Sequence, residues 1–309
     1  MSRRKPFPKN IEVAPVSFLV VHTENMDKIN LAETRTGNDW QLGFESDERS
    51  PVVSIVMPAY NAAATIAESI DCVVRQTYEN WKLIVVNDNS SDNTKAIVES
   101  YCARDPRIVL LNQDGNKGVA EARNLALRST RTAFVAFLDS DDLWEPEKLQ
   151  AQVKFMVENG HAITYTFYRR FKEDLQNISD VVVAPAALTY EQLLRNSAMA
   201  CLTVMLDRRR CGDVMFSKIR HEDFALWLQV LKRGLVAHCL PQDLARYRVS
   251  ENSLSSNKFK SSAWVWKVYR KSERLSLLKS FVCFSQYLFR AVKKRVGQRG
   301  LVGSEARSA

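Results

Sequence analysis

Hydrophobic and polar positions follow two different periods along the chain, and together they predict an α/β fold. From Val52 onward, short apolar runs typical of buried strands alternate with stretches whose apolar residues recur every three or four positions, as in helices. Strands and helices that alternate in this way favour βαβ units and a mainly parallel central sheet flanked by helices. The first four predicted strands are Val52–Met57, Leu83–Val86, Ile108–Leu111 and Ala133–Leu138.

Helices are predicted between and after these strands. One helix begins at Glu145-Pro146, because proline fits the first helical turn, and ends at Gly160. A further strand is predicted over Ala162–Phe167, while residues 186–210 are less regular. The other predicted helices are Ala64–Arg75, Thr94–Tyr101, Ala120–Leu127 and Phe224–Leu231.

The two ends of the chain differ from this middle region. Residues 1–50 hold one strand-like run, Val16–Val21, and no recognisable motif, so we assign them no role. We divide the chain into an N-terminal extension (1–50), a central domain (51–257) and an amphipathic helical tail (258–309). Within the tail, Ser262–Arg295 predicts one or two long helices. Their apolar stripe contains Phe281, Phe284, Leu288 and Ala291, and their polar stripe Lys279, Gln286, Arg290 and Lys293.

Composition excludes several classes of protein. A length of 309 residues with 46% hydrophobic residues is enough for a real core, which excludes wholesale disorder. The six cysteines lie far apart without a CxxC pair, which argues against a disulfide scaffold and a zinc ribbon and favours a reducing, cytoplasmic compartment. Because the sequence has no apolar signal core and no run of about 18 apolar residues, we predict no membrane-spanning helix.

The net charge of +9 is a property of the tail. Residues 258–309 carry 13 Lys and Arg against two Glu, a net +11, so the rest of the chain sums to −2. A basic amphipathic helix of this kind favours peripheral binding to an anionic membrane surface, with a gain of about 1 kcal/mol per Lys or Arg near the lipid. The alternative is a helical cap that packs on the fold and makes homodimer contacts.

Polar side chains directly follow three of the predicted strands. Pro58-Ala-Tyr-Asn61 follows the first strand, Asn87-Asp88 the second, and Asp139-Ser-Asp-Asp142 the fourth. In an open parallel sheet, ligands bind beyond the carboxyl ends of the strands. We therefore expect these three segments to meet at one site.

The acidic turn at residues 139–142 indicates a divalent metal ion. Three carboxylates within four positions repel one another, and Mn²⁺ or Mg²⁺ offsets this repulsion by binding carboxylate and phosphate oxygens together. We expect the ion to bridge Asp142, and Asp141 beside it, to a diphosphate. The alternative is a helix cap with solvated surface charge.

Tyr60 and Asp88 are candidates for a nucleotide base pocket. Tyr60 offers a π face, and Asp88 can accept the imide N–H that uracil presents. Pro58, Asn61 and Asp139 complete the expected nucleotide-binding set. Simple packing by Tyr60 and an Asx turn at Asp88 are the alternatives.

Five motifs, in order over roughly residues 52–250, resemble those of the large inverting family-2 glycosyltransferases. They are Val53–Asn61, Val85–Thr94, Gly118–Asn124, Asp139–Asp142 and His221–Leu228. The resemblance implies a GT-A fold, a nucleotide-sugar donor, a divalent metal and inversion at the anomeric carbon. The tail is similar to that of members that build bacterial surface polysaccharide, which implies a lipid-linked saccharide acceptor. Two departures are Asn87, where many members have aspartate, and the lack of the Gln-x-x-Arg-Trp signature of processive synthases.

The same resemblance assigns roles to single residues. Tyr60 and Asp88 would hold the base, and Asp141 and Asp142 would serve the ribose, the diphosphate and the metal. Asp223 would be the catalytic base, because an acceptor hydroxyl must lose its proton as it attacks. Glu222 is the second candidate, and the alternative for the pair is a favourable charge at a helix start.

Two arginines are further candidates for nucleotide binding. Arg123 lies near the start of the helix behind Gly118 and could reach the diphosphate, with a surface salt bridge as the alternative. Arg248 lies on a polar segment after the Phe224–Leu231 helix, where we expect a mobile loop that closes over the donor.

Two other functions were weighed. A sugar-nucleotide pyrophosphorylase would have a Gly-rich basic loop after the first strand, where this chain has Pro58–Asn61. A nucleic-acid-binding protein is suggested by Trp264, Trp266 and Tyr269 among basic residues, but the −2 charge of the remaining chain would repel phosphate backbones, so we expect no nucleic-acid partner.

Overall fold

The computed structural model describes residues 50–172, 175, 178–196, 198–249 and 258–302, without the side chains of 258–261 and 290–302. In these residues the strands form one nine-stranded sheet in the order β3-β2-β1-β4-β8-β6-β9-β5, with β7 paired to β9. The strands are β1 (Val53–Ala59), β2 (Trp81–Asn87), β3 (Ile108–Asn112), β4 (Phe134–Phe137), β5 (Leu143–Trp144), β6 (Ile163–Phe171), β7 (Ala187–Leu188), β8 (Met205–Asp207) and β9 (Ala237–Arg248).

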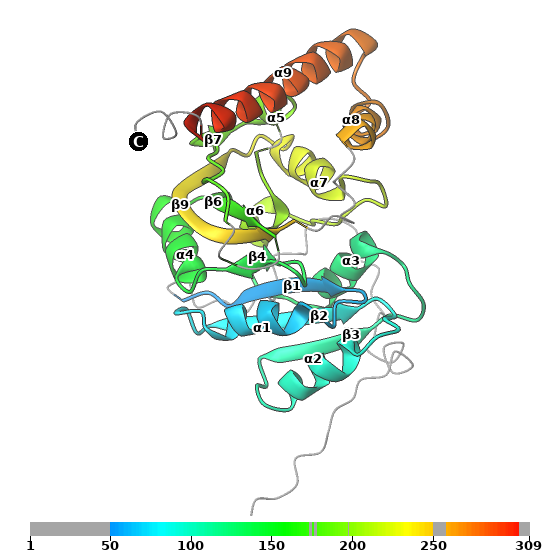
Figure 1. Cartoon of the computed structure of the whole chain (residues 1–309), viewed down its shortest axis with the longest axis vertical. Coiled ribbons are helices and arrows are strands. Elements are labelled where there is room, and N and C mark those ends of the chain that lie inside the picture. Colours follow the sequence, from blue (N-terminus) through cyan, green and yellow to red (C-terminus); the bar gives the residue numbers. More distant parts are fainter. Residues whose placement is uncertain (1–49, 173–174, 176–177, 197, 250–257, 303–309) are drawn as a thin grey trace, which may run out of the picture. The chain divides into compact units, whose positions relative to one another are not determined.

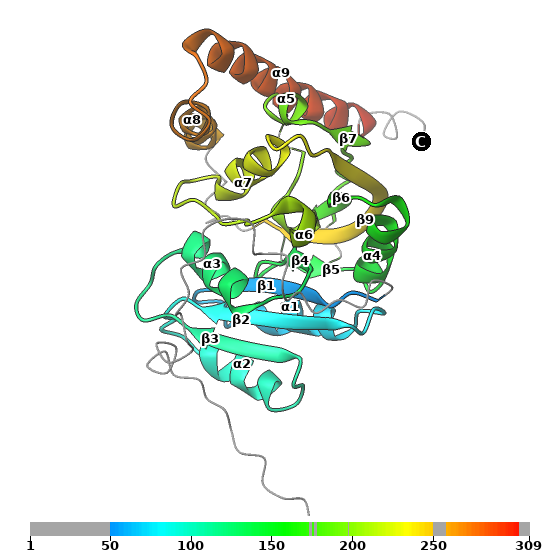
Figure 2. The same ribbon diagram turned by 180° about the vertical axis from the view of Figure 1, so that it is seen from behind.

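Helices cover both faces of this sheet (Figures 1 and 2). The helices of the described residues are α1 (Ile66–Val74), α2 (Thr94–Cys102), α3 (Val119–Ser129), α4 (Lys148–Asn159), α5 (Tyr190–Leu193), η3 (Cys201–Thr203), α6 (Arg208–Cys211), α7 (Glu222–Leu231), α8 (Lys258–Lys267), η4 (Val268–Ser272) and α9 (Leu277–Val302).

The core has two halves because successive residues of a strand point to opposite faces. Val53, Ile55 and Met57 of β1 pack with α1, α2 and α4, whereas Val56 packs with α3 and α7. Burial on both sides explains why β1 and β2 appear in the sequence as continuous apolar runs. The predicted α/β fold with a central sheet flanked by helices is confirmed.

The sheet is parallel only in part. The strands β3, β2, β1 and β4 pair in parallel, as expected, but β8 joins β4 and β6 in antiparallel orientation and β5 is antiparallel to β9. The long strand β9 was not predicted. Its apolar alternation is broken at Pro241-Gln242, and its pairing with β6 shifts register nearby, so no regular period marks it.

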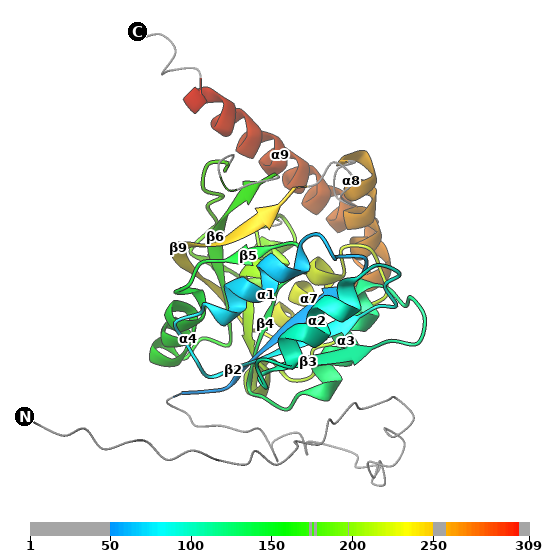
Figure 3. The same cartoon turned by 60° about the horizontal axis from the view of Figure 1, so that its bottom comes forward.

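The tail begins with helices that pack on the fold. Val265, Val268 and Tyr269 belong to the same hydrophobic cluster as α7, and Cys283 of α9 is buried in it too. Glu273, directly after η4, accepts a hydrogen bond from the Tyr190 hydroxyl at 2.7 Å. Figures 1 and 3 both place α9 at the end of the sheet domain opposite β3. In the described part of the chain, no helix combines the length and apolarity that crossing a bilayer requires.

Candidate functional site

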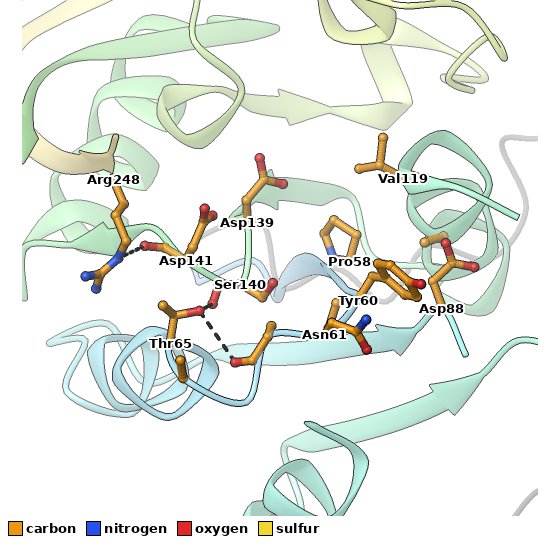
Figure 4. A pocket seen from close by; sticks show the side chains of 14 residues that line it. Pro58, Tyr60, Asn61, Thr65, Asp88, Val119, Asp139, Ser140, Asp141 and Arg248 are labelled. Carbon is orange, nitrogen blue, oxygen red and sulfur yellow. Dashed lines mark hydrogen bonds between the residues drawn. The ribbon is translucent and has the colours of Figure 1, made fainter. Parts of the chain in front are cut away.

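A cavity of about 440 Å³ opens at the carboxyl ends of β1, β2 and β4, where the sequence pattern predicts the site. Seven predicted site residues line it and are labelled in Figure 4: Pro58, Tyr60, Asn61, Asp88, Asp139, Asp141 and Arg248. Arg123, Asp142, Glu222 and Asp223 do not line it. The cavity is elongated, with Tyr60 and Asp88 towards one end and Asp141 and Arg248 towards the other (Figure 4).

The end formed by Tyr60 and Asp88 has the chemistry of a base pocket. The Tyr60 ring is 52% exposed, an unusual state for a large aromatic side chain beside a cavity. The backbone N–H groups of Lys117 and Gly118 donate hydrogen bonds to the two carboxylate oxygens of Asp88, at 2.7 and 2.8 Å. Asp88 is thus buried and fixed, and its remaining lone pairs can accept a further hydrogen bond.

The backbone around this end is held in uncommon conformations. Asn61 and Asn89 both have φ in the left-handed region, at 48° and 58°, which asparagine tolerates better than most residues. Their two turns are tied together, since the Asn61 N–H donates to Ser90 Oγ at 3.0 Å and Asn61 Oδ1 accepts from the Ser91 N–H at 2.9 Å.

The structure explains why asparagine stands at position 87. The Asn87 amide donates a hydrogen bond to Asn112 Oδ1 at 3.0 Å, while Asn87 Oδ1 accepts from the Ser90 N–H at 3.1 Å. An ionised aspartate could accept but not donate there. Asn87, where many family members have aspartate, therefore holds the loop between β2 and α2 through these two hydrogen bonds.

The other end of the cavity is acidic. Asp139 and Asp141 both line it, and burial, followed by the charge of Asp139, raises the pKa of Asp141 to about 6. Thr65, which was not predicted, donates its hydroxyl to the Ser140 carbonyl at 2.9 Å and so fixes this turn. The sequence did not single it out, because the predicted helix already begins at Ala64, whereas α1 begins at Ile66.

Asp141 is better placed than Asp142 to hold a divalent cation. Asp142 is 1% exposed and its Oδ1 accepts the Arg248 N–H at 2.8 Å. In the described residues, no set of three or more His, Cys, Asp or Glu is arranged to hold a metal ion. Mg²⁺ is commonly bound by one or two carboxylates together with substrate phosphates, and the poorly compensated charge of Asp141 fits that arrangement. Of the two expected metal ligands, Asp141 lines the cavity and Asp142 does not.

Arg248 is part of a strand, so the prediction of a mobile loop at this residue is wrong. It ends β9, and its Nε donates to the Asp141 carbonyl at 2.8 Å while its Nη2 pairs with Glu68 at 2.5 Å. The guanidinium also lies 4.4 Å from the centroid of the Phe171 ring. Arg248 is therefore a fixed cation in the cavity wall. Residues 250–257, the rest of the predicted loop, lie outside the described residues.

Glu222 and Asp223 begin α7. The preceding residue, His221, has a left-handed φ of 59°, and its ring lies 5.6 Å from that of Trp264 in α8. Asp223 Oδ1 accepts the N–H of Phe224 at 2.7 Å, and burial, followed by the charge of Glu222, raises the pKa of Asp223. A carboxyl with a raised pKa is a stronger proton acceptor once ionised.

Arg123 connects these acids to the cavity. Its guanidinium is buried, and pairs with Asp139 at 2.6 Å and with Glu222 at 2.7 Å. The alternative of a surface salt bridge is therefore excluded. No local pattern predicts that Arg123 and Glu222, which lie 99 positions apart, would meet.

Comparisons with known proteins agree with this geometry. A family model described as Glycosyl transferase family 2 matches residues 54–203. The putative teichuronic acid biosynthesis glycosyltransferase TuaG of Bacillus subtilis is 41% identical over 247 residues, which is 80% of this chain and 98% of the relative. The Escherichia coli UDP-Glc:alpha-D-GlcNAc-diphosphoundecaprenol beta-1,3-glucosyltransferase WfgD is 43% identical over 218 residues, which is 70% of this chain and 85% of the relative.

Two solved structures share the fold. Residues 1–349 of S. aureus TarS, in complex with UDP-GlcNAc, match with a TM-score of 0.58 at 18% identity, over 76% of this chain and 71% of that one. The mannosyltransferase PcManGT of Pyrobaculum calidifontis, in complex with GDP-Man and Mn²⁺, matches with a TM-score of 0.60 at 19% identity, over 87% and 81%.

Proposed function

Since this chain belongs to glycosyl transferase family 2 and is a glycosyltransferase, we propose that it moves one sugar from a UDP-sugar to a polyprenyl-diphosphate-linked saccharide in bacterial surface-polysaccharide synthesis. The observation that carries the proposal is the cavity itself, which has a base-pocket end at Tyr60 and Asp88 and an acidic, arginine-bearing end at Asp141 and Arg248. A nucleoside diphosphate has the matching polarity, with an aromatic base at one end and charged oxygens at the other.

The chemistry of Asp88 supports a uridine donor. Its carboxylate is held by two backbone N–H groups and is an acceptor only. Uracil presents an imide N–H to such an acceptor, and the exposed Tyr60 ring supplies a stacking face. Two relatives, WfgD and WfaP of Escherichia coli, are described as UDP-Glc transferases, which supports the same choice.

The acidic end would bind the diphosphate together with Mn²⁺ or Mg²⁺. Asp141 is the residue best placed to hold the ion, with Asp139 beside it, and Arg248 supplies a fixed positive charge. When bound, the ion would neutralise charge on the departing diphosphate.

The reaction is a single displacement at the anomeric carbon. Asp223 removes the proton of the acceptor hydroxyl as its oxygen forms a bond to that carbon. The bond from the carbon to the diphosphate oxygen breaks, and its electron pair leaves with UDP. Because attack and departure occur on opposite faces, the configuration at this carbon inverts.

The donor assignment predicts selective nucleotide binding. In a calorimetric titration with Mn²⁺ present, UDP is expected to bind at least about tenfold more tightly than CDP, because cytosine has no hydrogen on N3, where uracil presents its imide N–H to Asp88. Asp88→Asn should reduce that preference, since the amide is both a donor and an acceptor. Lys95→Gln, at an exposed position of α2, is the matched control. Equal affinity for UDP and CDP in the unmodified protein would contradict the donor assignment.

The acceptor of WfgD and WfaP is a diphosphoundecaprenol lipid, which supports a membrane-bound acceptor here. The outer side of α9 presents an apolar surface of the kind that contacts a membrane. Its inner side, with Cys283, Phe284 and Tyr287, packs on the core. The exposed large apolar residues of α9 are Leu277, Leu278, Phe281, Val282, Leu288 and Phe289.

We assign this exposed face of α9 to an anionic lipid surface, with the protein peripheral at the cytoplasmic side of the membrane. The +11 charge of residues 258–309 matches anionic headgroups, and apolar side chains at the centre of a basic helix insert at the acyl boundary. The ring of Trp264 lies against His221, next to the catalytic pair, so the same tail leads from the lipid face to the acceptor side of the site.

The membrane assignment predicts that Phe281→Ser with Phe289→Ser weakens binding to anionic vesicles about tenfold or more, with thermal stability little changed, because both rings are largely exposed. Binding by the unmodified protein should fall as salt rises, since screening shortens the reach of each charge. Val157→Ser with Val183→Ser, two exposed positions elsewhere, is the control. Truncation at Phe281 is unsuitable, because it would also remove core contacts of Cys283 and Phe284. Vesicle binding that is insensitive to the Phe281 and Phe289 changes would contradict the assignment.

A further inference from the structure

Arg123 occupies a position that neither nucleotide binding nor surface charge explains. It projects from α3, is 3% exposed, and its Nε is buried without a hydrogen-bond partner. Burial of a guanidinium is costly unless opposite charges compensate it. Here one carboxylate comes from each side: Asp139 follows β4 on the donor side, and Glu222 begins α7 on the acceptor side.

The neighbouring residue fixes the same region. The Asn124 amide donates to the Phe216 carbonyl at 2.9 Å, and the Phe216 N–H donates to Asn124 Oδ1 at 2.7 Å. The Phe216 ring in turn lies 5.1 Å from the Arg123 guanidinium carbon. Two successive residues of α3 therefore hold the segment that leads into α7. Asn124 bonds to the backbone of Phe216, and Arg123 pairs with the Glu222 carboxylate.

This arrangement treats the two acids of α7 differently. Glu222 gives one of its oxygens to a short, charge-assisted bond with Arg123, which favours its ionised form and fixes its direction. Within the described residues Asp223 forms no salt bridge, and the hydrogen bond to its carboxylate comes from the adjacent Phe224 N–H. Of the two acids, Glu222 is therefore the one in direct contact with the guanidinium, in the part of the chain that the structure describes.

We propose that Arg123 is the positioning residue that makes Asp223, and not Glu222, the base, and that it couples the acceptor-side helix α7 to the donor-side turn at Asp139. The inference rests on the proposed function, since it concerns the base of that reaction. It replaces the expectation that Arg123 binds the diphosphate directly. Arg123 acts through Glu222 and Asp139 and touches neither substrate.

The charges around Asp223 give this role a further consequence. His221 and Glu222 come from its own segment, Arg123 from α3, and the Cys201 thiol from η3. Arg123 lowers the pKa of Asp223, whereas burial and Glu222 raise it. Without Arg123, the negative charge of Glu222 would be uncompensated and would compete with ionisation of the base.

The test is a double-mutant cycle of Arg123→Gln and Glu222→Gln, with kcat, donor KM and thermal melts measured for each variant. Arg123→Gln should lower kcat about 10²-fold, which is the loss expected of a misplaced catalytic group. Its donor KM should stay within about threefold of that of the unmodified protein. Glu222→Gln alone should cost less than about tenfold. Adding Glu222→Gln to Arg123→Gln should restore kcat at least about tenfold, because the uncompensated charge is then gone.

Arg128→Gln is the control, because Arg128 lies on the same helix and pairs with Glu121 at 2.6 Å on the surface. It should leave kcat unchanged. If Arg123→Gln does not fold, Arg123→Lys tests the positioning role by itself: it keeps the positive charge but cannot hold both carboxylates in the fixed fork of a guanidinium, so it should lower kcat with donor KM little changed.

Three results would overturn the inference. They are additive losses in the cycle, a loss confined to donor KM, and a lower melting temperature with normal kcat. The last would indicate a purely structural arginine. Failure of the proposed function is seen separately, as an unmodified protein that transfers no sugar or as an Asp223→Asn variant with normal turnover.

Discussion

Replacement of Asp223 by asparagine is expected to lower turnover about 10²- to 10⁴-fold while donor affinity stays nearly constant. The amide preserves the shape of the side chain but cannot take the acceptor proton. Asp223 does not line the donor cavity, so the loss should fall on kcat and not on binding of UDP. Steady-state kinetics with a soluble acceptor, together with UDP titration, measure the two quantities independently.

The pH dependence of the unmodified enzyme provides a second test of Asp223 as the catalytic base. Burial and the neighbouring Glu222 raise the pKa of Asp223 above its ordinary value of about 3.9. Since the base must be ionised to accept a proton, activity should fall as the pH drops through this raised pKa. Glu222→Gln should move that acidic limb to lower pH. A loss in Glu222→Gln equal to that in Asp223→Asn would transfer the role of base to Glu222.

Chelation of divalent metal is expected to abolish transfer, and Mn²⁺ or Mg²⁺ should restore it. The acidic end of the cavity holds Asp141 with a raised pKa beside Asp139, an unfavourable arrangement until a cation compensates it. Removal of a hydrogen-bond partner of a metal ligand costs roughly 10- to 100-fold in metal affinity. Because Asp141 is proposed as a ligand itself, Asp141→Asn should weaken metal binding by more than that.

Asp142→Asn is the informative comparison for this prediction. Its carboxylate already accepts the Arg248 N–H and is almost fully buried, so we expect its main effect on the placement of Arg248. Metal titration followed by calorimetry distinguishes the two variants. Full turnover in chelator would contradict the metal assignment, and a larger loss of metal affinity in Asp142→Asn would restore Asp142 as the principal ligand.

The first half of the fold was predictable because its strands are buried on both faces. β1 and β2 appear as unbroken apolar runs, and parallel pairing then brings the ends of β1, β2 and β4 together. This is why the residues after those strands meet around one cavity, as the sequence pattern predicts. β9 was missed because its apolar alternation breaks at Pro241-Gln242 and the charged residues Asp243, Arg246 and Arg248 follow that break.

Contacts between distant segments could not be predicted from local pattern. The pairing of Arg123 with Glu222 depends on how α3 and α7 pack against the sheet, and no spacing in the sequence encodes it. In α9 the predicted apolar stripe combined residues that the structure separates: Phe284 packs inward, whereas Phe281 is 65% exposed. Periodicity identifies an apolar face, but it does not say which side finds a partner when apolar residues occur on two sides of a helix.

The most direct test of the account is a transfer assay with the full-length protein, Mn²⁺, a polyprenyl-diphosphate-linked saccharide and a panel of UDP-, GDP- and dTDP-sugars. Mass spectrometry of the lipid product, followed by nuclear magnetic resonance of the new linkage, reports both the sugar added and its configuration. The account predicts one added sugar, from a UDP-sugar only, with the anomeric configuration inverted. A product made from a GDP- or dTDP-sugar, retention of configuration, or no transfer from any UDP-sugar would contradict it.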